Sequence, residues 1–492
     1  MRSSIFTVLF CFLLLGSLAS AHVGSPDVYY EGASGPYRLF VTVRTPQMIP
    51  GIARIEVQVL DGPVSDIQIV PLRVIGEGSQ TAPPADSMEQ SKSDPKFFTG
   101  KLWLMESGSF QVRIEINGER GKAQMGVPVP AFAQRTLGMQ KTTGLVLTAL
   151  MIFLVLSLIS ILGAATRESQ LEPGSIVPPA SLQRGRIAMV VTAVVILAIL
   201  FLGNLWWSSV ANANAKDMVY KPPPMEASLA NGNHLTLKLG PSYWHDLRKA
   251  EQLNKIIPDH GHLMHLFLVR TPEMDRFYHL HPEQISANTF GEALPPVAGG
   301  NYALFADIVR ESGFPDTMTA QLQIAQNLPS SAGSPNAGDD SVVEAPPVSN
   351  AQINTVARLG AGEHVEWLLN GQAIQAQKPS LLRFRVVDQN GAPASDLELY
   401  MGMAGHLVIL RRDLSVFAHV HPAGTVPMAA LMLLENNSAN DMASMPETQH
   451  GPLPAEITFP YGFPQAGDYR LFLQVKRAGQ VETAVFDTQV VP

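Results

Sequence analysis

Cysteine is almost absent from this 492-residue chain, because Cys11 is the single one. It lies inside a segment that we predict to be a cleaved signal peptide, so the mature chain would contain none. Without cysteine there are no disulfides, thiolate zinc sites, blue-copper thiolates, covalently attached c-type haem or cysteine-ligated iron–sulfur clusters. Any transition metal must then be held by histidine, methionine, carboxylates or the amino terminus.

Charge is also scarce, since charged residues make up 15% of the chain, against about 25% in ordinary soluble proteins. The shortage of charge indicates membrane segments. The net charge is -8 and no block of Lys and Arg stands out, which argues against nucleic acid as a partner. The sequence also has no Walker loop, dinucleotide fingerprint, nucleophile elbow or zinc-protease helix motif. It therefore gives no direct indication of an enzyme.

Three apolar segments predict how the chain meets a membrane. Residues 1–21 have the pattern of a secretory signal peptide, ending in Ala19-Ser20-Ala21, and cleavage there would leave His22 at the amino terminus. An uncleaved anchor is the alternative. Residues 143–165 and 187–207 carry no charge and are long enough to be transmembrane helices.

The signal peptide sets the predicted orientation. Residues 166–186 would be a short cytoplasmic loop, and both large segments would lie outside the cytoplasm. We therefore predict a protein of the bacterial inner membrane, with its N- and C-terminal domains in the periplasm.

Alternating apolar and polar residues predict mainly β structure outside these helices. In residues 22–135 the alternation is clear at 37–44, 54–59 and 110–116. Several such half-buried strands, separated by Gly and Pro, are typical of a β-sandwich. After a linker at 208–228, residues 229–325 and 353–492 predict a second and a third module. A stretch rich in Ser, Pro, Gly and Asn, residues 326–352, predicts a flexible linker between them.

The second and third modules are diverged copies of one repeat, here called copy one (229–325) and copy two (353–492). The segment from His265 to Pro282 matches the segment from His406 to Pro422, and each ends in His-x-His-Pro. A second shared block begins at Gly300 in copy one and at Gly467 in copy two. Two separated matching blocks are hard to obtain by chance.

Six of the 13 histidines fall at equivalent positions of the repeat. They predict two triads: His265, His279 and His281 in copy one, and His406, His419 and His421 in copy two. Residues two apart in a strand point to the same face, and an upstream strand folded back would add the third ring. Such a set can hold Cu(II) or Zn(II) without sulfur. The alternative is that the rings are structural and bond backbone carbonyls at the rim of each sandwich.

Further candidate ligands flank the triads: His260 and His262 in copy one, and Met401 and Met403 in copy two. An insertion in copy two, residues 428–450, carries four more methionines and His450. Thioethers favour Cu(I), so we predict that copy one prefers Cu(II) and copy two retains Cu(I) better. A loop without ligands is the alternative. A terminal His22 could also chelate copper through its α-amine and its ring nitrogen. The alternative is that His22 binds no metal.

The blocks at 264–282 and 417–422 resemble those of bacterial YtkA-like, copper-associated β-sandwich proteins. The resemblance covers about 229–325 and 353–492, and it implies an immunoglobulin-like or cupredoxin-like fold and metal handling. The order sandwich, two helices, sandwich is also similar in architecture to the copper-bearing subunit of particulate methane monooxygenase. The first sandwich has no His-x-His to complete a site with His22, so that activity is not carried over.

Together these features predict three sandwich modules, two transmembrane helices and a non-enzymatic, membrane-anchored periplasmic protein. We expect it to bind or relay copper, with zinc as the other candidate metal. Two other hypotheses stay open. One is an assembly or scaffold protein whose sandwiches bind other envelope proteins and whose histidines are structural. The other is a copper-dependent oxidative enzyme.

Overall fold

The structure is a computed structural model that describes residues 27–492, except 77, 80, 173, 231, 242–254, 330–337, 349–352, 361, 370 and 438–451. The predicted signal peptide and His22 lie outside the described residues. The chain divides into a β unit, built on both sides of residues 133–221, and a helical unit formed mainly by those residues. The prediction of a mainly β fold with two long apolar helices is confirmed.

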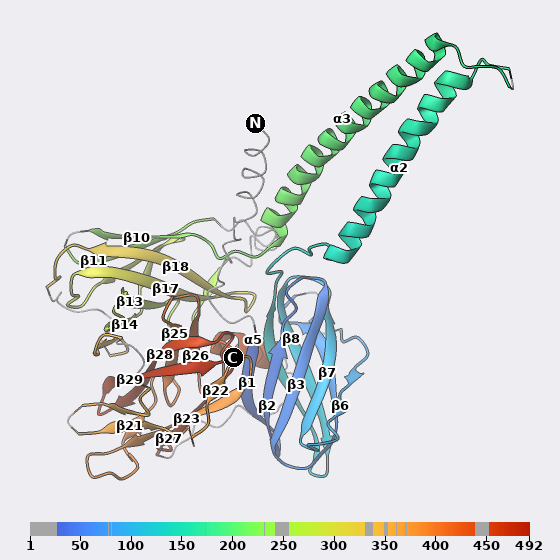
Figure 1. Ribbon diagram of the computed structural model, residues 1–492. Helices are drawn as coiled ribbons and strands as arrows, with labels where there is room; N and C mark the ends of the chain where they lie inside the picture. Colours follow the sequence, from blue (N-terminus) through green and yellow to red (C-terminus); the bar gives the residue numbers. More distant parts are fainter. Residues whose placement is uncertain are drawn as a thin grey trace. The chain divides into compact units, whose positions relative to one another are not determined.

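The helical unit is a hairpin of α2 (Lys141–Glu168) and α3 (Pro179–Met218), drawn in green in Figure 1. The helices touch at two glycines. A Cβ on Gly163 would lie 2.4 Å from Met189 Cγ, and one on Gly185 would lie 3.1 Å from the Gly163 carbonyl oxygen. Both helices are long and apolar enough to cross a membrane, with mean hydropathies of 2.9 and 2.6. Their exposed apolar side chains are typical of helices that contact lipid.

Both helices extend beyond the predicted spans. The spans 143–165 and 187–207 lie inside α2 and α3, and the ends of the predicted loop, 166–168 and 179–186, are helical. Pro179 stands at the start of α3, where its missing N–H leaves no helical hydrogen bond unmade.

The first sandwich consists of two antiparallel sheets. One has the order β1 (Val28–Ser34), β2 (Tyr37–Arg44), β3 (Gly51–Asp61), β7 (Phe97–Leu104) and β6 (Glu89–Gln90). The other has the order β5 (Asp86–Ser87), β4 (Val64–Arg73), β8 (Gly108–Gly118) and β9 (Gly121–Ala131). The alternating apolar residues, among them Val41, Ile55 and Ile114, are fully buried between the sheets. Period-two burial is the pattern on which the sequence prediction depended.

Copy one also has two sheets. The smaller has the order β10 (Met225–Ala230), β11 (His234–Leu239), β16 (Thr289–Ala293) and β15 (Glu283–Ser286). The larger has the order β12 (Ile256–Ile257), β17 (Gly300–Arg310), β13 (His265–Thr271), β14 (Arg276–Leu280) and β19 (Ser341–Glu344), and β18 (Pro315–Ile324) also pairs with β17. Strand β19 comes from residues 326–352, which the composition had indicated to be a flexible linker. Its backbone pairs with β14, from Arg276 opposite Glu344 to His279 opposite Ser341.

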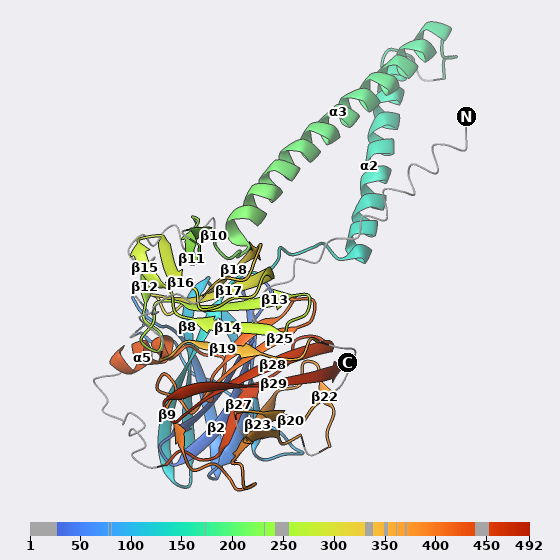
Figure 2. The ribbon, with the colours of Figure 1, turned by 90° about the vertical axis from the view of Figure 1, so that its left-hand side faces the viewer.

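Copy two repeats this arrangement. Its smaller sheet has the order β20 (Val356–Arg358), β21 (His364–Trp367), β23 (Ser380–Val387) and β27 (Glu456–Tyr461). Its larger sheet has the order β22 (Ile374–Gln375), β29 (Gln480–Val491), β28 (Gly467–Arg477), β25 (His406–Arg411) and β26 (Phe417–Val420), and β24 (Leu397–Glu398) pairs with β28. The insertion begins with a helix, α5 (Met428–Asn437). Figure 2 shows the larger sheets of the two copies next to each other, in yellow-green and red.

The two larger sheets pack face to face through a shared core, here called the inter-copy core. Its rings pair in a reciprocal way. Phe305 of copy one stacks on Phe417 of copy two with centroids 4.5 Å apart, and Phe277 of copy one stacks on Phe472 of copy two at 4.2 Å. Phe277 is the repeat equivalent of Phe417, and Phe305 is the equivalent of Phe472. A contact that recurs with the partners exchanged is the signature of a two-fold interface, here between copies within one chain.

The first sandwich also packs against copy two. Tyr29 of β1 is buried in the core of copy two, while Val426 and Ala430 of copy two are buried in the core of the first sandwich. Backbone hydrogen bonds join the segments, since the Glu31 N–H donates to the Ala423 carbonyl over 2.8 Å and the Thr425 N–H donates to the Tyr29 carbonyl over 2.9 Å. The three sandwiches therefore form one packed β unit.

Candidate metal centre

Eight histidines gather at one end of the inter-copy core, and we call them the histidine cluster: His260, His262, His265, His279, His281, His406, His419 and His421. Short distances between ring centroids connect them into one group. His262 stacks on His281 at 4.0 Å, His281 lies 4.6 Å from His279, and His419 lies 4.5 Å from His421. All eight were candidate ligands in the sequence. His22 and His450 lie outside the described residues.

The strand pairing explains how the repeat brings its rings together. In copy one Phe267 of β13 is opposite His279 of β14, and in copy two Val408 of β25 is opposite His419 of β26. The first histidine of each repeat, His265 or His406, therefore lies across from the end of the His-x-His strand. This is the cross-strand geometry expected from the sequence.

Three of the rings form a first triad, His265, His279 and His281. One nitrogen from each lies within 4.8 Å of the others, and all three side chains are buried. His265 Nδ1 is 3.2 Å from His279 Nε2. Two nitrogens bound tetrahedrally to one ion at 2.0–2.1 Å would be about 3.3 Å apart. His265 and His279 are thus spaced as two ligands of one metal ion would be.

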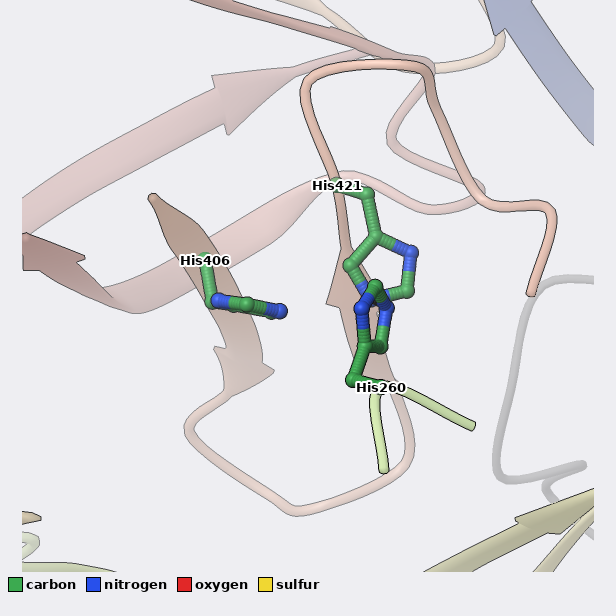
Figure 3. A group of neighbouring side chains, drawn as sticks. All are labelled: His260, His406 and His421. Carbon is green, nitrogen blue, oxygen red and sulfur yellow. Dashed lines mark hydrogen bonds between the residues drawn. The ribbon is translucent and has the colours of Figure 1, made fainter. Parts of the chain in front are cut away.

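The second triad combines both copies. It consists of His406 and His421 from copy two and His260 from copy one, again with one nitrogen each within 4.8 Å (Figure 3). His260 Nε2 is 3.2 Å from His421 Nε2. The sequence had grouped His406 and His421 with His419 instead. His419 lies beside both triads, with its ring 5.3 Å from His406 and 5.4 Å from His265.

A tight turn directs His260 toward copy two. Asp259 and His262 close the turn by paired backbone hydrogen bonds, and His260 has a φ of 51°. Copy two has the same turn, closed by Tyr400 and Met403, with Met401 at a φ of 50°. Residues other than glycine seldom adopt this conformation, which costs of order 1–3 kcal/mol and often marks a functional site. His260 and Met401 are therefore structural equivalents across the repeat.

Outer hydrogen bonds fix which nitrogen of each ring faces the triads. His260 Nδ1 donates to the Met401 carbonyl at 3.0 Å, and His265 Nε2 donates to the Asp259 carbonyl at 3.1 Å. His281 Nδ1 donates to Asp340 at 3.0 Å. In a neutral ring the opposite nitrogen then carries the lone pair.

Two more rings donate one N–H to an outer acceptor and so direct the other nitrogen toward the triads. His279 Nδ1 donates to Gln474 Oε1 at 2.9 Å, and His421 Nδ1 donates to the Val426 carbonyl at 3.4 Å. The pairs that are 3.2 Å apart, His265 with His279 and His260 with His421, therefore bring two lone pairs together. Two acceptors at this distance repel each other unless a proton or a metal ion lies between them. Metal-binding histidines usually have such an outer acceptor, which fixes the tautomer and the ring orientation.

Burial keeps the rings neutral. It lowers the pKa of His265, His279, His406 and His421 well below the ordinary value, and neighbouring histidines lower it further. Burial also lowers the pKa of His260. Neutral imidazole is the form that ligates metal, so these rings need not lose a proton before binding.

Of the rings that the structure describes, His406 most clearly lacks a partner that a metal ion would supply. Its side chain is fully buried, and neither ring nitrogen has a hydrogen-bond partner among the described residues. Leaving a buried polar atom unbonded costs about 1–3 kcal/mol. Figure 3 shows the edge of this ring directed toward His260 and His421.

Four acidic residues surround the cluster, and the sequence analysis missed three of them, Asp307, Asp339 and Asp340. Asp340 pairs with His281, Asp339 lies 3.3 Å from His262 Nε2, and Asp307 lies 3.5 Å from His419 Nδ1. Asp259 lies 3.8 Å from His260 and also accepts a hydrogen bond from the Ala429 N–H in α5. Asp307 could have been found from the repeat, because it occupies the position in copy one that Gln474 occupies in copy two. Asp339 and Asp340 gave no signal, since they lie in the predicted linker.

The described methionine candidates show no hydrogen bond between a sulfur atom and the histidine cluster. Met401 contributes its backbone carbonyl to His260, and the buried Met403 closes the turn with Tyr400. Within the insertion Met428 begins α5 and Met432 is 49% exposed on it. Met442 and Met445 lie outside the described residues.

Comparison with known proteins gives little further information. A protein family described as a domain of unknown function (DUF8832) matches residues 360–491, which covers most of copy two. No curated protein matches the chain.

Solved structures with detectable likeness include the ICAM-5 D1–D4 ectodomain fragment, with 8% identity over 92% of this chain and 76% of that chain and a TM-score of 0.14. Another is Escherichia coli alpha-2-macroglobulin, with 8% identity over 93% of this chain and 31% of that chain and a TM-score of 0.18. A third is a membrane-anchored protein of Corynebacterium diphtheriae, with 8% identity over 95% and 96% and a TM-score of 0.16. Likeness at these TM-scores carries no functional argument. The chain's function must be inferred from its own residues.

Proposed function

We propose that this protein is a membrane-anchored metal-binding protein of the bacterial periplasm, and that it holds copper in the histidine cluster. One observation carries the proposal. In each triad the outer hydrogen bonds fix tautomers that direct lone pairs toward each other, 3.2 Å apart. This arrangement stabilises a bound cation and destabilises the empty site.

Copper is favoured over other metals because a given nitrogen site binds Cu(II) more tightly than the other divalent first-row ions. Imidazole also suits zinc, which is held by three histidines in known sites. Zinc is the competing metal, and the loading experiment below separates the two.

The geometry changes how a copper relay would work. The sequence had suggested transfer across a flexible linker between two separate sites. Because both triads belong to one cluster, transfer would instead take place between neighbouring rings. The helices α2 and α3 would anchor this cluster at the membrane, with the sandwiches in the periplasm.

The experiment uses the full chain in detergent, because Tyr29 and Val426 interlock the first sandwich with copy two. The protein is stripped with a chelator, loaded with Cu(II) or Zn(II), and assayed for bound metal and thermal stability. A ligand at 1,000 times its Kd stabilises the folded state by about 4 kcal/mol. We expect copper to bind stoichiometrically and to raise the melting temperature.

The scaffold hypothesis predicts the opposite result. If the histidines are structural, neither metal binds stoichiometrically or shifts the melting temperature, and removing a ring only destabilises the fold. His364→Ala is the matched control, because His364 is a partly exposed histidine of copy two on β21, close to Glu366. The enzyme hypothesis requires product formation by the copper-loaded protein with a reductant.

A further inference from the structure

We propose that the two triads are halves of one binuclear centre, in which two metal ions bind side by side at the two-fold interface between the copies. This inference rests on the proposed function and deepens it. The proposed function requires only that the triads bind metal, whereas a binuclear centre also requires that the two bound ions interact.

Proximity is the first reason. Rings from different triads are only slightly farther apart than rings within one triad. His260 of the second triad is 5.9 Å from His265 of the first, and His406 is 6.4 Å from His279. Within the triads, His265 and His279 are 5.4 Å apart, and His260 and His406 are 5.1 Å apart. The two triads are therefore direct neighbours.

Reciprocal orientation is the second reason. His279 of copy one bonds Gln474 of copy two, and His419 of copy two faces Asp307 of copy one. Gln474 and Asp307 are equivalent, because they lie opposite His406 and His265 in the sheet pairing. Each copy therefore orients a ring of the other, as the reciprocal phenylalanine stacks also do. With His260 crossing as well, neither copy can complete the centre by itself.

His419 lies beside both triads and can add a fourth imidazole to one of the two ions. Its side chain is 5% exposed, and its Nε2 is buried without a hydrogen-bond partner among the described residues. Its Nδ1 faces Asp307, so Nε2 is the atom left for a metal. The ring lies 4.5 Å from His421 of the second triad and 5.4 Å from His265 of the first.

The surrounding charge fits two divalent ions. Four carboxylates contact the cluster, from Asp259, Asp307, Asp339 and Asp340, and one ammonium, from Lys476, lies 3.5 Å from Asp339. Two buried divalent ions next to each other would repel strongly without nearby negative charge. The four carboxylates and the one ammonium leave a net charge of about -3, which offsets most of the charge of two such ions.

The test is electron paramagnetic resonance of the full chain loaded with Cu(II) alone. We expect two copper ions per chain at saturation, and a spectrum showing spin–spin interaction, with lost intensity of the isolated-ion signal and a half-field transition. Two ions with full-intensity, isolated signals would overturn the binuclear centre and leave the proposed function standing. Saturation at one ion would also overturn it. A chain that binds no copper contradicts the proposed function itself.

Two variants locate the interaction. His419→Gln should weaken the binding of one copper ion by more than about tenfold, and should remove the half-field transition at copper concentrations that fill only the tighter site, because it removes a ligand of one ion. His260→Gln should leave one ion with an isolated signal. His364→Gln is the control and should match the wild type. If His419→Gln retains both the affinity and the spin–spin interaction, His419 is not a ligand of the centre.

Discussion

Acid should unfold the β unit of the metal-free protein over a narrow range of pH. Burial lowers the pKa of six rings below the ordinary value of 6.5, namely those of His260, His265, His279, His281, His406 and His421. In the unfolded chain these rings take up protons below pH 6.5, while in the folded protein they stay neutral. Their full contribution to stability is therefore present above pH 6.5 and is lost as the pH falls through the range below it.

The number of rings sets the magnitude. Each proton that binds only to the unfolded chain lowers the free energy of unfolding by about 1.4 kcal/mol per pH unit. The four rings whose pKa burial lowers well below 6.5, those of His265, His279, His406 and His421, give a limiting slope of about 5 kcal/mol per pH unit, reached about one unit below pH 6.5. The total stability of a folded protein is about 5–15 kcal/mol, so about one to three pH units below 6.5 should be enough to unfold it.

Urea unfolding at pH 7.5, 6.5 and 5.5 measures this slope. The fluorescence of Trp367, which is 3% exposed in the core of copy two, should report the transition. We expect the urea midpoint to fall steeply between pH 6.5 and 5.5 in the metal-free protein. In the copper-loaded protein the urea midpoint should fall less over the same pH range, because bound metal keeps the rings deprotonated. A midpoint unchanged between pH 7.5 and 5.5 would refute the conclusion that these rings are neutral and buried.

Three further predictions concern other parts of the structure. Phe417→Ala removes the stack on Phe305 and should lower the free energy of unfolding by about 3–5 kcal/mol. The control Val342→Ala, at a residue 49% exposed, should change it by less than about 0.5 kcal/mol. Equal losses for the two variants in urea unfolding would contradict the inter-copy core. Asp259→Ala removes the acceptor for the first turn of α5 and should cost about 1 kcal/mol in the same assay, and an unchanged midpoint would show that this contact is dispensable. Reporter fusions after residues 135 and 230 should give extracytoplasmic signals and one at residue 175 a cytoplasmic signal, and a cytoplasmic signal at 230 would overturn the proposed topology.

The repeat made much of the site predictable. Matching His265 with His406 and the two His-x-His pairs identified six ligand candidates, because strand periodicity fixes which side chains share a face. The same periodicity, with two long uncharged segments, was sufficient for the fold class. These features depend on short-range order along the chain, which one sequence displays directly.

The contacts between copies were not predictable in this way. His260 joins His406 and His421 because two turns and two sheets meet across an interface, and no local pattern specifies which faces pack. Asp339 and Asp340 reach the cluster because the four residues of β19 pair with β14. Their composition resembles a linker, and only tertiary pairing makes the segment a strand.

The most direct test of the central claim is the metal content of the His265→Ala, His406→Ala double variant, measured beside the wild type and His364→Ala after loading with copper. The double variant removes one ring from each triad and leaves the outer hydrogen bonds of His260, His279 and His421 in place. We predict that the wild type and the control bind the same amount of copper and that the double variant loses it. Equal copper in all three proteins would show that the histidine cluster is not the metal site.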